Sequence, residues 1–212
     1  MKRKRILVLV FLLLIGMISG CKKNATDDKV DASAYEKIQK QLTNMTSYES
    51  KATVKYISNK NTNEYETLQQ CKTSGEYRIE VTGPEKVAGN ITMYDGSTIY
   101  QQNKKISGKI AVSTKETQER SEILFTSFLK NYTQSNEIAV MAATIDEGKC
   151  TVLEATIPGE HPFLAKEKLW IDNKTLNPVQ LSIYDQDGSE RISVTYNTFA
   201  YNVDLEGELF KP

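Results

Sequence analysis

Residues able to do covalent or metal chemistry are few in this chain of 212 residues, which has three cysteines and one histidine. Cys71 and Cys150 lie far apart in stretches typical of β-strands, and His161 precedes a proline in an expected loop. A catalytic thiol needs a nearby base, and zinc needs Cys and His ligands at close spacing. The pattern therefore predicts neither a thiol enzyme nor a metal site. For Cys71 and Cys150, buried free thiols are the commoner state, and a disulfide is the open alternative.

The acidic residues do not form an evident catalytic pair either. Asp146-Glu147, Asp185 and Asp187 fall in expected hairpin turns, where solvated tips are a better interpretation than the carboxyl pair of a glycosidase. The sequence has no Gly-rich phosphate loop, no Gly-x-Ser-x-Gly elbow and no His-Glu-x-x-His. We therefore expect a protein that is not an enzyme, with no catalytic residue, no metal and no cofactor.

The third cysteine, Cys21, stands where covalent lipidation is expected. Four cations at positions 2–5 precede an apolar run from Ile6 to Ile18, which has the length of a signal-peptide core and is too short to span a bilayer. The next residues, Ile18-Ser19-Gly20-Cys21, match the bacterial lipobox, in which the thiol receives a diacylglyceryl group and the chain is cut before the cysteine. We expect residues 1–20 to be a lipoprotein signal peptide and Cys21 the lipidation site. An ordinary secretory signal with a chance cysteine is the alternative.

The segment after the cysteine is polar and suits a tether. Residues 21–32 contain too little apolar surface to join a core, so we expect a lipidated flexible linker there. The remaining residues, 33–212, are enough for one domain. Loss of the four signal cations from a balance of 27 cationic and 27 anionic residues leaves 23 against 27. A slightly acidic domain without a basic patch indicates no binding of nucleic acid.

Two stretches have helical spacing. Ser33 and Glu36 form a capping box, with Ser33 as the expected N-cap of a helix over about 34–46. Ser113 and Glu116 form a second capping box, which predicts a helix near 114–132. The apolar stripes of the two helices are Tyr35, Ile38, Leu42 and Met45 in the first, and Leu124, Phe125, Phe128, Leu129 and Tyr132 in the second. We expect both stripes to pack on the domain's own sheet.

The rest of the chain alternates with period two between turn signals, which is typical of an antiparallel meander. About ten strands are predicted, at 52–56, 65–73, 77–81, 89–93, 98–100, 138–144, 150–157, 165–171, 179–184 and 191–199. Trp170 stands between two aliphatic residues and is expected to be largely buried, with an exposed aromatic anchor for a partner as the alternative. The polar turns near Lys104-Lys105 and Asn173-Lys174 are candidate hinges or contact loops.

The order helix, meander, helix, meander resembles the LolA-like fold of lipoprotein carriers. The stretches that carry the resemblance are Gly75–Glu80, Tyr94–Tyr100, Leu169–Asp172, Asn177–Val179, Tyr184–Gly188 and Phe199–Phe210. The resemblance covers residues 33–212. It implies an α+β fold, with a LolA-like open antiparallel β half-barrel of about ten strands covered by two or more helices.

With its lipobox and its length, the chain is further similar to the clostridial germination lipoproteins of the GerS group. This resemblance implies a protein that partners a CwlD-type cortex amidase during sporulation and supports germination. It also implies a location on the outer side of the cell membrane, held by diacylglyceryl-Cys21, which in spores is the space between the forespore and mother-cell membranes.

Several alternatives stay open at this point. A LolA-like cavity could serve a lipid or lipoprotein receptor or carrier, and some proteins of this fold regulate envelope stress or sigma factors. A free sheet edge could also support a strand-exchanged homodimer. The sequence indicates no partner-binding residues and does not say which edge is free.

Overall fold

The computed structural model of this protein describes residues 29–103, 109–112, 120–159 and 161–211. The expected signal peptide, Cys21 and most of the expected tether therefore lie outside the described residues. The capping box at Ser113 and Glu116 and the turn at Lys104-Lys105 lie outside them as well.

The described chain folds into one sheet, two α-helices and two short 3-10 helices. In chain order these are α2 (Ala32–Thr43), β1 (Ser47–Ile57), β2 (Thr62–Lys72), β3 (Tyr77–Gly83), β4 (Ile91–Tyr94), β5 (Ile99–Gln102), β6 (Lys109–Val112), η1 (Arg120–Ile123), α3 (Phe125–Gln134), β7 (Ile138–Ile145), β8 (Gly148–Thr156), β9 (Lys166–Asp172), β10 (Pro178–Tyr184), β11 (Glu190–Tyr201) and η2 (Gly207–Phe210).

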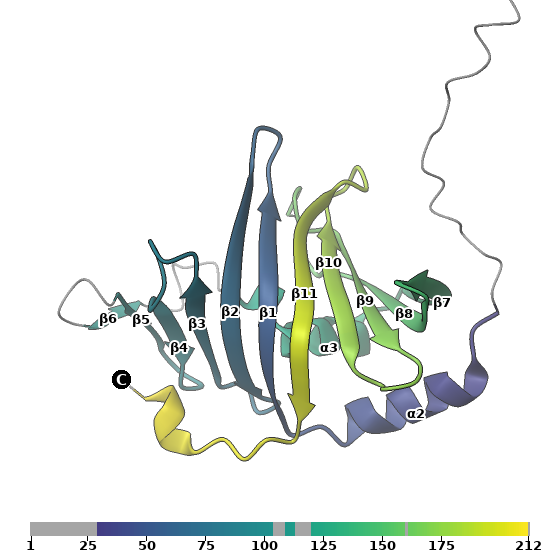
Figure 1. The fold of residues 1–212 in the computed structure, drawn as a ribbon, viewed down its shortest axis with the longest axis horizontal. Helices are drawn as coiled ribbons and strands as arrows, with labels where there is room; N and C mark the ends of the chain where they lie inside the picture. The colour runs from purple at the N-terminus through teal and green to yellow at the C-terminus, as the bar shows by residue number, and fades with distance from the viewer. Residues whose placement is uncertain (1–28, 104–108, 113–119, 160, 212) are drawn as a thin grey trace, which may run out of the picture.

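The sheet has eleven strands in the order β6-β5-β4-β3-β2-β1-β11-β10-β9-β8-β7. Strands β1 to β6 form one meander and β7 to β11 another, and β1 pairs antiparallel with β11 at the centre. The two meanders thus meet through the first and last strands, while β6 and β7 form the edges at opposite ends of the sheet (Figure 1). This open antiparallel sheet with helices confirms the expected α+β class.

Both α-helices contribute to the core on one face of the sheet, which we call the inner face. Ile38 of α2 and Phe125 and Phe128 of α3 are buried in one cluster with inward residues of the strands. In Figure 1, α3 lies behind the sheet and α2 lies along its lower end. The alternation along β1 follows from this arrangement, because Tyr48 and Val54 are buried while their chain neighbours are more exposed.

Each helix begins at a different residue from the one predicted. Asp31, not Ser33, is the N-cap of α2, since its carboxylate accepts the backbone N–H groups of Ser33 and Ala34 at 3.0 and 3.1 Å. The α-helix expected near 114–132 begins only at Phe125, because Leu124 is extended (φ −90°, ψ 138°) and residues 120–123 form a 3-10 turn.

The strand predictions hold, with one strand missed. Ten strands were expected and each is present within a few residues, whereas the four-residue β6 was not predicted. The alternation after Phe199 continues as a strand only to Tyr201, and η2 follows near the end of the described chain. Trp170 lies on β9 as predicted, but it is only half-buried and faces away from the core that contains Leu169 and Ile171.

Candidate functional site

The two described cysteines are buried and free, as the sequence indicated. Burial raises the pKa of Cys71 to about 12 and that of Cys150 to about 11, which keeps both thiols protonated and unreactive. His161 lies in the loop between β8 and β9, where its Nδ1 accepts the backbone N–H of Phe163 at 3.3 Å. The structure therefore does not bring the three residues together as a nucleophile and base.

The acidic residues divide into two kinds. Asp146 and Glu147 are exposed at the tip of the β7–β8 hairpin in left-handed conformations, and Asp187 is exposed between β10 and β11, so their interpretation as solvated tips is confirmed. Among the described residues, no group of three or more His, Cys, Asp or Glu is placed to hold a metal ion.

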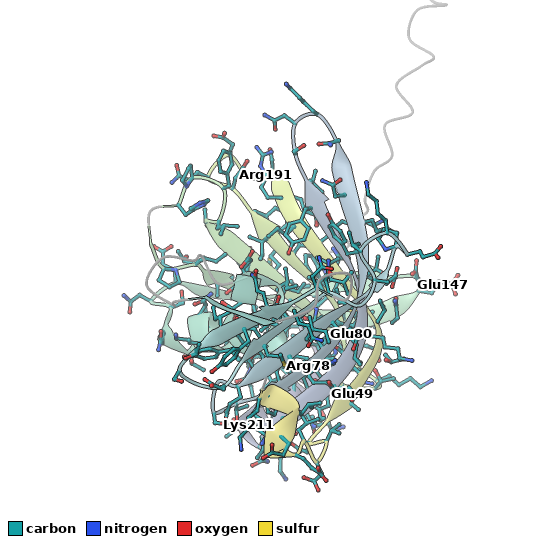
Figure 2. All side chains as sticks on the ribbon, turned by 90° about the vertical axis from the view of Figure 1, so that its left-hand side faces the viewer. Glu49, Arg78, Glu80, Glu147, Arg191 and Lys211 are labelled. Atoms are coloured by element: carbon teal, nitrogen blue, oxygen red, sulfur yellow. The ribbon has the colours of Figure 1, made fainter. Side chains whose placement is uncertain are left out.

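Asp185 is not a solvated tip, contrary to the prediction. It is 5% exposed and pairs with Arg191 at 2.6 Å, at the upper end of the sheet (Figure 2). Desolvation acts to raise the pKa of Asp185, yet that pKa is lowered because the Ser189 N–H and Arg191 donate hydrogen bonds to the carboxylate. Arg191 also contacts Asn59 and the Phe163 ring, so the cluster ties three loops together.

The inner face is largely filled by aromatic rings. Phe125 is fully buried, with its ring centroid 5.7 Å from Tyr48 and 5.1 Å from Phe199. A hollow of about 270 Å³ remains beside this cluster. Its lining is mostly apolar and consists of Val54, Tyr56, Tyr65, Thr67, Ile79, Val81, Val87, Asn90, Thr92 and Ile123. Small-molecule sites usually measure about 300–1,000 Å³, so this hollow lies below that range.

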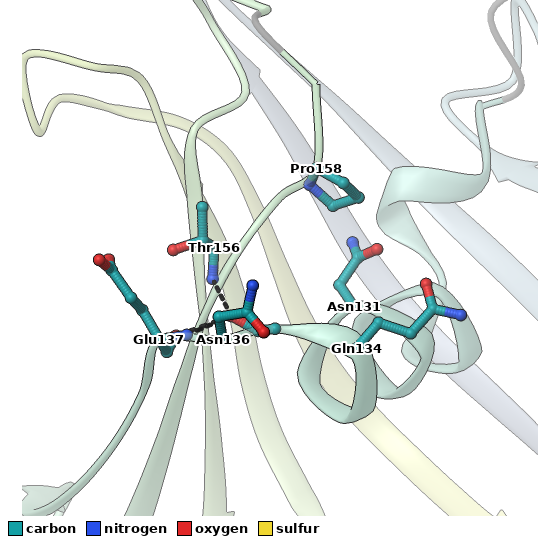
Figure 3. A pocket seen from close by; sticks show the side chains of 7 residues that line it. Asn131, Gln134, Asn136, Glu137, Thr156 and Pro158 are labelled. Carbon is teal, nitrogen blue, oxygen red and sulfur yellow. Dashed lines mark hydrogen bonds between the residues drawn. The ribbon is translucent and has the colours of Figure 1, made fainter.

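A second groove, of about 390 Å³, lies where α3 ends and the chain enters β7 (Figure 3). It is lined by residues that are all polar except one: Asn131, Gln134, Ser135, Asn136, Glu137, Thr156 and Pro158. Ser135 fixes the turn, because its hydroxyl donates to the Glu137 carbonyl at 2.7 Å and accepts the backbone N–H of Thr156 at 3.4 Å. The amide groups of Asn131, Gln134 and Asn136 are presented around this groove (Figure 3).

Glu167 is a buried acid for which the sequence predicted no role. It lies on β9, only 1% exposed, and its Oε1 has no hydrogen-bond partner; the Tyr196 hydroxyl has none either. Burial raises the pKa of Glu167 to about 7, although Asn131 donates a hydrogen bond that acts to lower it. A signal was present in the sequence, because Glu167 shares the period-two face of Leu169 and Ile171.

We expect Glu167→Gln to stabilise the protein at pH 8 by about 3 kcal/mol and to have little effect at pH 4.5. The folded pKa of about 7 exceeds the usual 4.5, so the folded state holds the proton more tightly. The contribution of Glu167 to the wild-type free energy of unfolding is therefore most favourable below pH 4.5, and it is lost as the pH rises through 7. Urea unfolding of both proteins at pH 4.5 and pH 8 measures the difference. Equal pH dependence in the two proteins would contradict the prediction.

The geometry thus defines an open antiparallel sheet with a packed inner face. A family model described as "Sporulation protein YdcC-like" matches residues 1–210. The chain belongs to this family of sporulation proteins.

Solved structures with the same architecture extend the comparison. A chain from the structure of the Clostridioides difficile CwlD amidase in complex with the GerS lipoprotein is 30% identical, over 84% of this chain and 99% of that one, with a TM-score of 0.49. An uncharacterized conserved protein from Thermus thermophilus is 12% identical over 84% and 93%, with a TM-score of 0.54. A LolA superfamily protein from Nitrosomonas europaea is 15% identical over 85% and 96%, with a TM-score of 0.45.

No curated protein matches this chain. The open antiparallel sheet with its helices agrees with the expected LolA-like fold. The family match and the 30% identity to a chain of the GerS–CwlD structure support the expected resemblance to GerS. Within the described ranges, no helix is both long enough and apolar enough to cross a membrane.

Proposed function

We propose that this protein is a membrane-anchored, non-enzymatic lipoprotein of sporulation that binds a CwlD-type cortex amidase and supports its activity. Residues 1–20 act as the lipoprotein signal, Cys21 carries the diacylglyceryl group, 21–32 form the tether and 33–212 form the binding domain. The protein lies on the outer side of the cell membrane, which in spores is the space between the forespore and mother-cell membranes. Cortex modification and germination depend on the complex.

One observation carries this proposal. The 30% identity to a chain of the GerS–CwlD structure extends over 99% of that chain, so it includes the whole domain and is not confined to a common core. Membership of a sporulation family supports the same setting. The free, protonated thiols and the solvated hairpin acids fit a protein that works by binding.

The carrier alternative is less well supported by the geometry. An acyl chain needs an open apolar channel, whereas Phe125 and Phe128 are fully buried across the inner face. The remaining hollow of about 270 Å³ is small for a ligand of drug size, and smaller still for a diacyl lipid. Lipid that co-purifies with the protein in a stoichiometric amount would favour the interpretation as a carrier.

The proposal predicts that the full-length protein, purified in detergent, co-elutes with the cortex amidase of the same cell at micromolar concentration. A complex of this kind should also raise amidase activity on cortex peptidoglycan, while the lipoprotein alone shows no turnover. A sizing column and a muropeptide assay measure the two effects. Separate elution, together with unchanged cortex in a deletion strain, would overturn the proposal.

A further inference from the structure

Strand β7 is one edge of the sheet and lacks the features that usually protect an edge. Its eight residues, Ile138–Ile145, include no charged residue and no proline, and its register with β8 is regular throughout. Within the described chain, residues 139–145 make no backbone–backbone hydrogen bond outside the β7–β8 ladder. Natural edges are usually interrupted or charged, because their outward backbone groups can pair with another chain.

An apolar surface continues from this edge across the outer face of the sheet. Met141 lies opposite Val152 on β8, and Val152 lies opposite Trp170 on β9, so the three side chains share one face. Val152 is buried but does not belong to the core cluster, and Met141 and Trp170 are half-buried. At the start of the strand, Ile138 shares the inner-face side with its β8 partner Ala155 and is 51% exposed at the edge.

The outer face is different over the other half of the sheet. Arg78 donates to Glu80 at 2.7 Å and to Gln70 at 3.3 Å, and Gln70 donates to Glu49 at 2.8 Å. Glu49, Arg78 and Glu80 are labelled in Figure 2. This half of the outer face therefore carries a polar network. The half next to β7 carries the apolar side chains of Met141, Val152 and Trp170, beside the ion pair of Glu154 with Lys168 at 2.8 Å.

Charge at the two ends of β7 indicates what kind of chain could pair with it. Glu137 precedes the strand, and Asp146 and Glu147 follow it, all exposed; Lys149 is the nearest exposed cation on β8. A second copy pairing antiparallel would place Glu137 of one chain beside Asp146 and Glu147 of the other, which is repulsive. A segment with cationic ends would instead be attracted at both ends.

We propose that the edge of β7, together with Met141, Val152 and Trp170, is the docking edge for an extended segment of a protein partner, with an apolar middle and basic ends. This inference rests on the proposed function, since the amidase is the partner that would supply the segment. Backbone hydrogen bonds along β7 add the segment as a twelfth strand, and the side chains facing Trp170 select it. Glu137 also lines the groove of Figure 3, so one end of the segment enters that groove.

The test measures the affinity of the full-length protein, in detergent, for the amidase by biolayer interferometry. Trp170→Ala removes a central aromatic anchor, and Met141→Lys places a charge on the docking edge; each should weaken binding by about 30-fold. Ile138→Lys should also weaken binding, and its exposed site keeps the fold intact. Glu137→Lys should weaken binding at 100 mM NaCl and lose this effect at 400 mM NaCl, since salt screens exposed charges.

Gln101→Lys is the matched control, because it adds the same charge to an exposed position on β5 near the opposite edge. Its affinity should equal that of the wild type, and thermal melts should show that all variants fold. If the Trp170→Ala, Met141→Lys and Ile138→Lys variants all bind the amidase with the affinity of the wild type, the docking edge is overturned and the proposed function still stands. No binding by the wild type would overturn both. A dimer of the protein alone that Met141→Lys dissociates would assign the edge to a second copy and overturn this inference.

Discussion

Replacing Phe125 with alanine should lower the free energy of unfolding by about 3–5 kcal/mol. Phe125 is fully buried and makes edge contacts with Tyr48, Tyr196, Phe199 and Tyr201, at centroid distances from 5.1 to 6.4 Å. Its ring thus joins α3 to both central strands. A cavity there would be surrounded by rigid rings that cannot collapse into it, so the cost should lie well above that of an ordinary substitution.

The measurement is urea unfolding of wild type and variant, with a melting temperature that should fall by roughly 6–20 °C. Lys130→Ala is the control, because Lys130 lies on the exposed side of the same helix and should change stability by less than about 0.5 kcal/mol. Phe125→Leu should cost less than Phe125→Ala, since it leaves a smaller cavity. A loss below about 1 kcal/mol for Phe125→Ala would show that α3 does not hold the inner face together.

The strands could be predicted from the sequence because alternation is a local signal. One apolar face of β3, for example, is predicted by the alternation of Tyr77, Ile79 and Val81 alone, without information from the rest of the chain. The pairing of β1 with β11 could not be predicted, because it joins residues about 150 positions apart and no short-range pattern encodes it. The start of α2 was misplaced for a local reason: Asp31 and Ser33 can both cap a helix, and only the geometry shows which one does.

The face of Trp170 shows where the alternation signal is lost. Leu169, Trp170 and Ile171 are all apolar, so the sequence does not reveal which of them point inward, and burial of all three was the natural prediction. The structure puts Leu169 and Ile171 in the core and Trp170 on the outer face. Such a run arises where both faces of a strand are apolar, and one of those faces then remains for a partner.

The anchor is a separate question from the fold, because Cys21 lies outside the described residues. A lipid anchor is indicated by the order of a basic start, an apolar run from Ile6 to Ile18, two small residues and a cysteine. Each part has a distinct physical role, since the charges set orientation, the apolar run engages the membrane and the thiol is the acceptor. A diacylglyceryl group adds two acyl chains, and two chains give stable attachment where one gives only reversible binding.

Cys21→Ala should therefore abolish lipid attachment and release the protein from the membrane fraction. The thiol is the acceptor of the diacylglyceryl group, and alanine offers no atom to take its place. Metabolic labelling with an alkyne fatty acid should mark the wild type and leave the variant unlabelled, and fractionation after a high-salt wash should find the variant in the soluble fraction. Cys71→Ala is the control, because its thiol is buried in the core and that variant should remain labelled and membrane-bound. Label retained by Cys21→Ala, or sedimentation with membranes after the wash, would show that the lipobox interpretation is wrong.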